Sequence, residues 1–276
     1  MSKSEEMPLV TSSREPEFDE TQRAFFRAVL QYLNAGGIPY AVSGAFALHY
    51  HTGIWRGIKD LDIFVTAETA PAALAVLKGP CFRREIPDDV WLAKVHCGDL
   101  YTDFITGMSN GALAVTPRWI ERGIASTVLD VPTRILAAEE LLASKLFVLR
   151  RERFDGADVV HILYRTAGRL DWGRIVELMG DHWEILFHAL VLYRYTYPGQ
   201  TDFVPSWIWA GLSDKFRMGI EKTDPTARFR GSLVDEHMFA IDTREWGLAD
   251  LLGENRARAR KISAHGGSTA SDRPKE

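Results

Sequence analysis

The chain has 276 residues, a length that can bury a substantial core in one large domain or two small ones. Its composition, 46% hydrophobic and 25% charged, is average for soluble globular proteins and excludes a wholly disordered or fibrous chain. A formal net charge of -4 excludes a global attraction to nucleic acid or anionic lipid, so any nucleic-acid role must be local.

Features of localisation and redox state can also be read from the sequence. No stretch approaches the ~20 consecutive apolar residues of a bilayer span, and the first residues are acidic rather than signal-like. We therefore expect a cytoplasmic protein with no membrane partner. The two cysteines, Cys81 and Cys97, are too few for a disulfide scaffold and lack zinc-site spacing, so we expect inert buried thiols. Residues 1–19 and 255–276 have a polar composition that predicts flexible tails.

The folded part of the chain begins with a predicted helix over residues 18–34, where apolar residues recur at helical spacing until Gly36. A short strand at 40–42 then meets a turn at Gly44, and a second helix is predicted over 45–50. The order is helix, strand, glycine turn and helix.

The next segments alternate between extended and helical patterns. They are a strand over 61–65, a helix over 71–78 and three strands over 81–86, 90–96 and 100–106. After Val131-Pro132 the pattern becomes helical, with helices predicted over 135–150, 157–166, 172–179, 183–195 and 207–217. The rest of 198–250 stays unassigned. These elements predict an α/β class, with a small mixed sheet flanked by helices and then a mostly helical domain that begins near residue 133.

Three aspartates in these elements carry the chemical signal. Asp60 and Asp62 lie at the start of a strand and project to one face, because side chains alternate along a strand. Asp103, on the strand over 100–106, can complete the cluster. Grouped carboxylates repel one another and therefore need a cation, and their hard oxygen atoms select Mg²⁺ or Mn²⁺. Two such ions about 4 Å apart can bridge a triphosphate during an in-line displacement.

Other interpretations of these aspartates remain open. Asp60 and Asp62 are also common residue types for a turn that leads into a strand. Asp103 could be a solvated charge on an edge strand, and Asp99 competes with it at the start of the same strand. The apolar pair after Asp103, Phe104-Ile105, favours Asp103.

Gly44 supplies a second part of the pattern. A glycine lets the backbone approach a phosphate closely, and the helix that follows offers unpaired N–H groups at its positive end. A glycine between strand and helix is weak evidence alone, so its value comes from the ordered set of Gly44, Asp60, Asp62 and Asp103.

The segment YAVSGAFALHYHTGIWRGIKDLDIFV, residues 40–65, resembles the signature of the DNA-polymerase-β-like nucleotidyltransferase superfamily. In that superfamily a Gly-Gly or Gly-Ser turn precedes an Asp-x-Asp pair. The resemblance implies that Asp60 and Asp62 bind both metals, and that Asp103 binds the catalytic metal and helps to deprotonate an acceptor hydroxyl. It also implies transfer of a nucleoside monophosphate from an NTP such as ATP, with release of pyrophosphate.

One position departs from this signature. Ala45 stands where the superfamily has a second Gly or a Ser whose hydroxyl can contact phosphate. Backbone N–H groups at Gly44 and Ala45 still allow nucleotide binding. The substitution leaves open altered nucleotide handling or an inactive domain.

A further segment, ELLASKLFVLRRERFDGAD at 140–158, resembles the second-domain pattern of the minimal or AbiEii-toxin-like branch of bacterial nucleotidyltransferases. That branch belongs to abortive-infection and toxin–antitoxin systems. The resemblance implies that Lys145 meets the triphosphate and that Asp158, or else Asp155, orients Lys145 or Arg153. The simpler alternative is that these basic residues only complement the dipole at the end of a helix.

The likeness covers roughly residues 20–165 and implies a catalytic domain over 20–132 followed by a helical domain over 133–254. The expected enzyme transfers a nucleotidyl group to a hydroxyl acceptor, which could be a tRNA, a protein or a small molecule such as an antibiotic. A toxin-like role would add an antitoxin-like protein partner. The alternative is a catalytically degenerate binding module that acts through a protein partner.

Histidine and aromatic residues receive simpler interpretations. His49 and His51 lie on an amphipathic helix, where a packing or surface role is commoner than a catalytic one. The later aromatic residues could stack a nucleobase, but core packing is the expected role. These are Trp172, Trp183, Trp207, Trp209 and Phe216.

Overall fold

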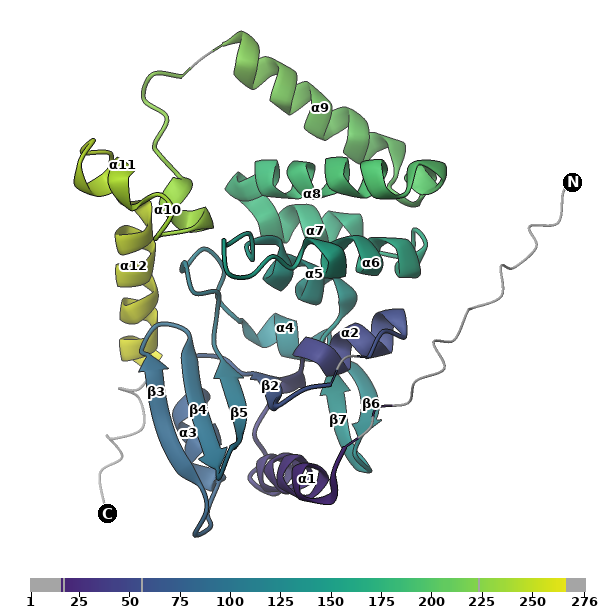
Figure 1. Cartoon of the computed structure of the whole chain (residues 1–276), viewed down its shortest axis with the longest axis vertical. Helices are drawn as coiled ribbons and strands as arrows, with labels where there is room; N and C mark the ends of the chain where they lie inside the picture. The colour runs from purple at the N-terminus through teal and green to yellow at the C-terminus, as the bar shows by residue number, and fades with distance from the viewer. Residues whose placement is uncertain (1–15, 17, 56, 223, 267–276) are drawn as a thin grey trace, which may run out of the picture.

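The structure is a computed structural model that describes residue 16 and residues 18–55, 57–222 and 224–266 (Figure 1). Its sheet has seven strands in the order β3-β4-β5-β2-β1-β7-β6. The strands are β1 Ala41–Val42, β2 Asp60–Phe64, β3 Arg83–Asp88, β4 Leu92–Cys97, β5 Leu100–Ile105, β6 Ile124–Val128 and β7 Val131–Ile135. The predicted α/β class with a mixed sheet is confirmed.

The direction of the strands makes the sheet mixed. β2 runs parallel to β5 and antiparallel to β1, while β1 runs parallel to β7. The remaining neighbours, β3 with β4, β4 with β5 and β6 with β7, are antiparallel. The parallel pair of β2 and β5 lies near the middle of the sheet, so both strands are fixed by neighbours on each side.

Helices cover the two faces of the sheet. α1, Glu20–Ala35, begins at Asp19, whose side chain accepts a hydrogen bond from the Gln22 backbone N–H at 2.7 Å. It crosses one face of the sheet (Figure 1), where Leu30 and Leu33 are fully buried. α3, Ala70–Val76, also contacts α1. α2, Gly44–Thr52, packs instead between the sheet and the helices that follow it.

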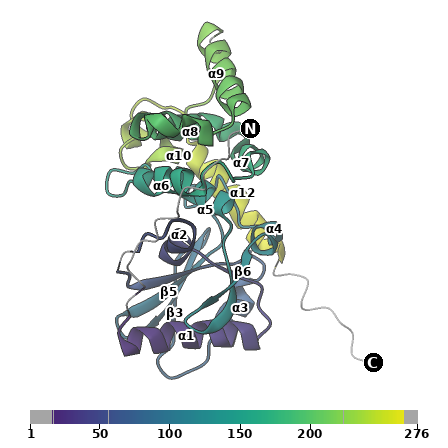
Figure 2. The same cartoon turned by 90° about the vertical axis from the view of Figure 1, so that its right-hand side faces the viewer.

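The second half of the described chain is helical and lies above α2 (Figures 1 and 2). These helices are α5 Ala138–Leu146, α6 Gly156–Thr166, α7 Trp172–Met179, α8 Trp183–Thr196 and α9 Ser206–Glu221, whereas α4, Pro117–Glu121, precedes β6 and is not among them. Short 3₁₀ helices, η1 Gly180–His182 and η2 Pro198–Phe203, lie on either side of α8. The described residues include no helix that combines the length and the apolar character needed to cross a bilayer.

The β6–β7 hairpin is the main element that the sequence pattern does not predict. Its loop consists of Leu129 and Asp130, with φ of 51° and 64°, although a two-residue hairpin turn of this kind usually contains glycine or asparagine. The helix predicted from residue 135 therefore starts on the last residue of β7. The boundary predicted near residue 133 therefore falls inside a strand, and α5 begins at Ala138.

A buried ion-pair network joins the sheet part to the helical part. Glu140, fully buried on α5, accepts a hydrogen bond from Arg174 Nε of α7 at 2.9 Å. Arg122, which follows α4, lies with its Nε 3.3 Å from the same Glu140 oxygen. Burial of a charged group is tolerated when it is paired and hydrogen-bonded, so these contacts favour one arrangement of α4, α5 and α7.

The C-terminal segment forms three helices, α10 Gly231–Val234, α11 Ala240–Arg244 and α12 Leu251–Gly266. α12 lies at the end of β3 (Figure 1) and is anchored there by charge pairs. Arg256 Nη2 donates to both oxygens of Asp88 at 3.0 and 2.9 Å, and Arg260 Nε donates to Asp89 at 2.9 Å. The tail predicted from residue 255 is therefore helical as far as Gly266, because long-range ion pairs hold it against the sheet.

The ends of the predicted tails lie outside the described residues, namely 1–15, 17 and 267–276. Phe18 falls within the predicted N-terminal tail, yet its ring stacks on Phe46 with centroids 5.6 Å apart. The folded core therefore begins slightly before the first helix.

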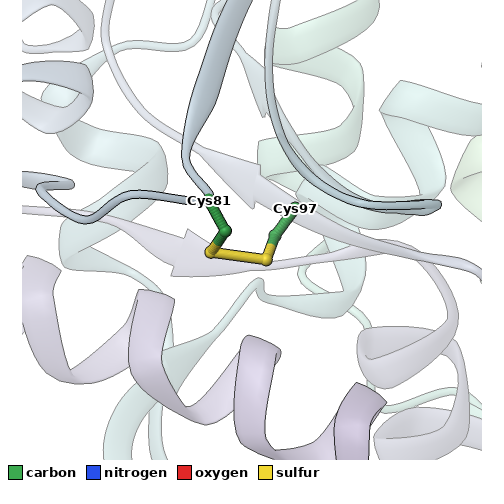
Figure 3. Close-up of a disulfide and its surroundings, with 2 residues drawn as sticks. All are labelled: Cys81 and Cys97. Carbon is green, nitrogen blue, oxygen red and sulfur yellow. A yellow bond between two sulfur atoms is a disulfide. The ribbon is translucent and has the colours of Figure 1, made fainter.

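The cysteines correct the prediction of inert thiols. Cys81 and Cys97 form a disulfide (Figure 3), with Cα atoms 4.8 Å apart, within the normal range. The antiparallel pairing of β3 with β4 places Arg83 opposite His96, and so brings the segment before β3 against the end of β4. The sequence spacing of the two cysteines does not reveal this hairpin geometry.

We predict that loss of this disulfide lowers the free energy of unfolding by about 3 kcal/mol, because the bond closes a loop of roughly 15 residues in the unfolded chain. Denaturant titration with and without dithiothreitol measures the change. A Cys81→Ser/Cys97→Ser variant should match the reduced protein and show no response to reductant. Identical titrations of the wild-type protein under both conditions would contradict the prediction.

Candidate active site

The three predicted aspartates converge on one face of the sheet. Asp60 and Asp62 lie on β2 with one residue between them, and the β2–β5 register pairs Asp62 directly with Asp103. One carboxylate oxygen from each residue lies within 4.8 Å of the others, and all three residues are half-buried. Asp99 is exposed and precedes β5, so the competing carboxylate is not part of this cluster.

Electrostatic repulsion is visible in the pKa values of this cluster. Burial, followed by the neighbouring charges of Asp60 and Asp103, raises the pKa of Asp62 to about 7, although the charges of Lys145 and Arg153 oppose the increase. Burial also raises the pKa of Asp103, although a hydrogen bond from Lys94 offsets part of that effect. Ionising all three groups is therefore unfavourable unless a cation joins them. A set of hard carboxylate oxygens at this spacing fits a divalent ion.

Gly44 is packed directly against Asp62. Its φ is +56°, in the left-handed region that favours glycine, and the backbone N–H of Ser43 donates to the Asp62 carbonyl at 2.9 Å. A Cβ atom at position 44 would overlap Asp62 Oδ2 and lie 2.7 Å from Asp62 Cγ. The glycine predicted for phosphate approach is thus also needed to make room for a carboxylate of the cluster.

The start of α2 faces the same cavity as the aspartates. Ser43, the residue that caps α2, makes no side-chain capping hydrogen bond and is only 2% exposed. The first N–H groups of a helix lack partners within the helix, so those near Gly44 and Ala45 can receive an anion. Both residues line a cavity of about 370 Å³ together with the three aspartates.

The helical part contributes the opposite wall of this cavity. Lys145 is buried on α5, and its Nζ donates to Asp155 Oδ2 at 2.9 Å and to Asp158 Oδ2 at 2.8 Å. Arg153 donates from Nε and Nη2 to the two oxygens of Asp155, each at 3.0 Å. The sequence offered Asp158 or Asp155 as the partner of Lys145 or Arg153, and the structure places both next to Lys145. Burial raises the pKa of Asp155, but hydrogen bonds from Arg153 and Lys145 outweigh this effect and hold the pKa below its ordinary value.

Sequence reasoning gave no role in the site to Ser43, Arg150 or Lys94. Ser43 and Arg150 line the cavity, and Arg150 hydrogen-bonds Ser109. Lys94 of β4 contacts Asp103 directly, with Nζ 2.7 Å from Oδ1. Alternation along the predicted strand over 90–96 shows on which face of that strand Lys94 lies. Only the register between β4 and β5 shows that its partner is Asp103.

The histidines have packing roles, as expected. His51 Nε2 lies 2.8 Å from the Leu136 carbonyl, and burial lowers its pKa. His49 packs edge-on against the Trp55 ring at 5.7 Å. Among the later aromatic residues, Trp172 is buried, but Trp207 and Phe216 are 56% and 47% exposed. The expectation of core packing is therefore wrong for these last two, which lie on α9.

No family model matches the chain, and no curated protein matches it. Solved structures with a similar fold include the antibiotic-resistance factor ANT(2'')-Ia, which is 14% identical, with a TM-score of 0.43 over 65% of this chain and 100% of that one. A nucleotidyltransferase candidate from Helicobacter pylori is 13% identical, with a TM-score of 0.34 over 90% and 96% of the two chains.

A third similar structure is a tRNA-processing enzyme, 14% identical, with a TM-score of 0.31 over 92% of this chain and 79% of that one. These solved structures include nucleotidyltransferases, the group that the sequence resembles. All three TM-scores are below 0.5, so these likenesses carry no conclusion about function.

We predict that Gly44→Ala destabilises the protein and abolishes divalent-cation binding, because the new methyl group would displace the Asp62 carboxylate. Gly37→Ala is the matched control, since Gly37 has a φ of +64° but no atom within 4 Å of an added Cβ. The control should lose only about 1–2 kcal/mol for the left-handed backbone. Thermal unfolding and Mn²⁺ titration measure both effects, and equal behaviour of the two variants would contradict the prediction.

A second prediction concerns Lys145. Replacing it by methionine removes one partner from a buried charge cluster and should lower the free energy of unfolding by roughly 3 kcal/mol. Denaturant titration measures this change. Lys222→Met, at an exposed lysine after α9, should alter stability by less than about 0.5 kcal/mol. A Lys145→Met variant as stable as this control would show that the buried pairs contribute no stability.

Proposed function

We propose that the protein is a Mg²⁺- or Mn²⁺-dependent nucleotidyltransferase that moves a nucleoside monophosphate from an NTP to a hydroxyl acceptor and releases pyrophosphate. The observation that carries this proposal is the convergence of Asp60, Asp62 and Asp103 within 4.8 Å, in a cavity that also contains the start of α2. A cluster of acids alone does not indicate a reaction. Its position opposite a helix N-terminus and buried basic residues favours a triphosphate.

Each group has a role in this proposal. Asp60, Asp62 and Asp103 hold the divalent ion, which when bound offsets the negative charge of the phosphate oxygens. The backbone N–H groups at Gly44 and Ala45 bind a phosphate. On the opposite wall the triphosphate meets two basic side chains and the carboxylates that orient them, namely Lys145, Arg153, Asp155 and Asp158.

These residues account for every bond and proton that changes in the proposed transfer. The acceptor hydroxyl oxygen forms a bond to the α-phosphorus, and the bond from that phosphorus to the bridging oxygen of the β-phosphate breaks. Pyrophosphate leaves with the bonding electrons, and the hydroxyl proton passes to Asp103 or to solvent beside it. Because the charge develops on oxygens that already face fixed donors, positioning and electrostatics supply the acceleration.

The acceptor is proposed at the level of its chemistry. A hydroxyl of a tRNA, a protein or a small molecule such as an antibiotic can reach the α-phosphorus from the open side of the cavity. A toxin-like role, with an antitoxin-like protein as partner, is the version of this proposal that the segment over 140–158 favours.

The second candidate function is a binding module without turnover. Ala45 favours it, because this position has no hydroxyl to contact phosphate. Such a module would bind a protein partner through surfaces that do not depend on the aspartates. Substituting the aspartates therefore separates the two functions.

The test measures NTP binding and label transfer together. Wild-type protein should bind ATP or another NTP in calorimetry only when Mg²⁺ is present, and should transfer label from an NTP in a panel of tRNA, protein and small-molecule acceptors. Asp62→Asn should lower transfer by roughly a hundredfold or more, because a group that stabilises developing charge is lost. Asp99→Asn, at the exposed carboxylate before β5, should leave both measurements unchanged.

Absence of Mg²⁺-dependent NTP binding and of label transfer in the wild-type protein would refute the proposed enzyme. Binding of a protein partner that is equally strong in Asp60→Asn and Asp62→Asn would favour the binding module instead.

A further inference from the structure

Lys94 forms an ion pair with the Asp103 carboxylate of the candidate site. Its Nζ lies 2.7 Å from Asp103 Oδ1 and 3.0 Å from Oδ2, so both oxygens are engaged by one ammonium group. The two side chains are only 21% and 13% exposed. The antiparallel register of β4 and β5 pairs Lys94 with Asp103 directly, which makes this contact a property of the sheet.

A second contact holds the same ammonium group. Lys94 Nζ lies over the Tyr101 ring, 4.1 Å from its centroid, within the range of a cation–π interaction. Tyr101 and Asp103 lie two residues apart on β5 and therefore project from the same face. The charge of Lys94 is thus fixed between two side chains of one strand, beside the carboxylate cluster.

The balance of charge shows what this arrangement leaves for a metal. Three ionised carboxylates carry three negative charges, and Lys94 compensates one of them. The group across the cavity adds no net positive charge, because Lys145 and Arg153 are paired with Asp155 and Asp158. The remaining two negative charges match a single divalent ion. Two divalent ions would require one of them to share Asp103 and displace Lys94.

We propose that the Lys94 ammonium takes the place of one of two divalent ions, so that the protein binds a single ion, on Asp60 and Asp62. Asp103 then faces the acceptor hydroxyl as a carboxylate held by Lys94 rather than as a metal ligand. Lys94 is a positioning residue that acts through Asp103. This inference rests on the proposed function and revises one role in it, because Asp60 and Asp62 alone then hold the ion and Asp103 does not.

Counting bound Mn²⁺ tests the inference without any substrate. Mn²⁺ alone is titrated into the full chain, and electron paramagnetic resonance measures the free ion. The wild-type protein should bind one Mn²⁺ per chain. Lys94→Met should bind two, because Asp103 becomes available and the local negative charge rises by one. Lys94→Gln provides a second neutral side chain, with the same expected result, if the methionine variant does not fold.

Two controls separate charge from shape. Lys94→Arg keeps the positive charge and should still bind one Mn²⁺. Lys78→Met removes an exposed lysine elsewhere and should also leave the count at one. Thermal unfolding of each variant verifies that it is folded.

Each outcome is decisive. Two ions per wild-type chain, one ion per folded neutral variant, or two ions per Lys94→Arg chain would overturn the inference and leave the proposed nucleotidyl transfer intact. Absence of Mn²⁺ binding in every form would overturn the inference together with the metal site on which the proposed function depends.

Discussion

Mutual repulsion among Asp60, Asp62 and Asp103 is the constraint around which the rest of the site is arranged. Their oxygens lie within 4.8 Å of one another, and burial together with the neighbouring charges raises the pKa of Asp62 to about 7. The paired strands β2 and β5 hold the backbones in register, so the three side chains leave the sheet on one face and close together. Gly44 makes room for the cluster because it has no side chain, and a side chain at this position would occupy the space of the Asp62 carboxylate.

The helical part of the molecule supplies the opposite wall of the cavity. The charged side chains of this wall pair with one another. Lys145 and its acidic partners neutralise one another across the start of α6. The fully buried Glu140, on the same helix as Lys145, ties α5 to α7 and to the segment after α4. Lys145, which lines the cavity, and Glu140, which ties the helices together, therefore lie on one helix.

The C-terminal segment reinforces a loop of the cavity from outside. Arg256 of α12 donates to the Ser109 carbonyl at 2.8 Å as well as to Asp88. An added Cβ at Gly111 would lie 2.9 Å from the Asn255 backbone, so this loop and α12 pack backbone against backbone. Ser109 lines the cavity and contacts Arg150. The last helix thus belongs to the support of the site, although it is distant from it in sequence.

The sequence alone determined which short elements form the candidate site. Alternation along β2 predicted that Asp60 and Asp62 share a face, and the glycine turn at Gly44 predicted the start of α2, because both signals are local and periodic. Only the tertiary structure decided the partners: Lys94 on Asp103, α12 on β3 and the bond from Cys81 to Cys97. Strand register, hairpin closure and long-range ion pairs depend on where distant segments meet, and the periodicity of a single segment contains no information about its neighbour.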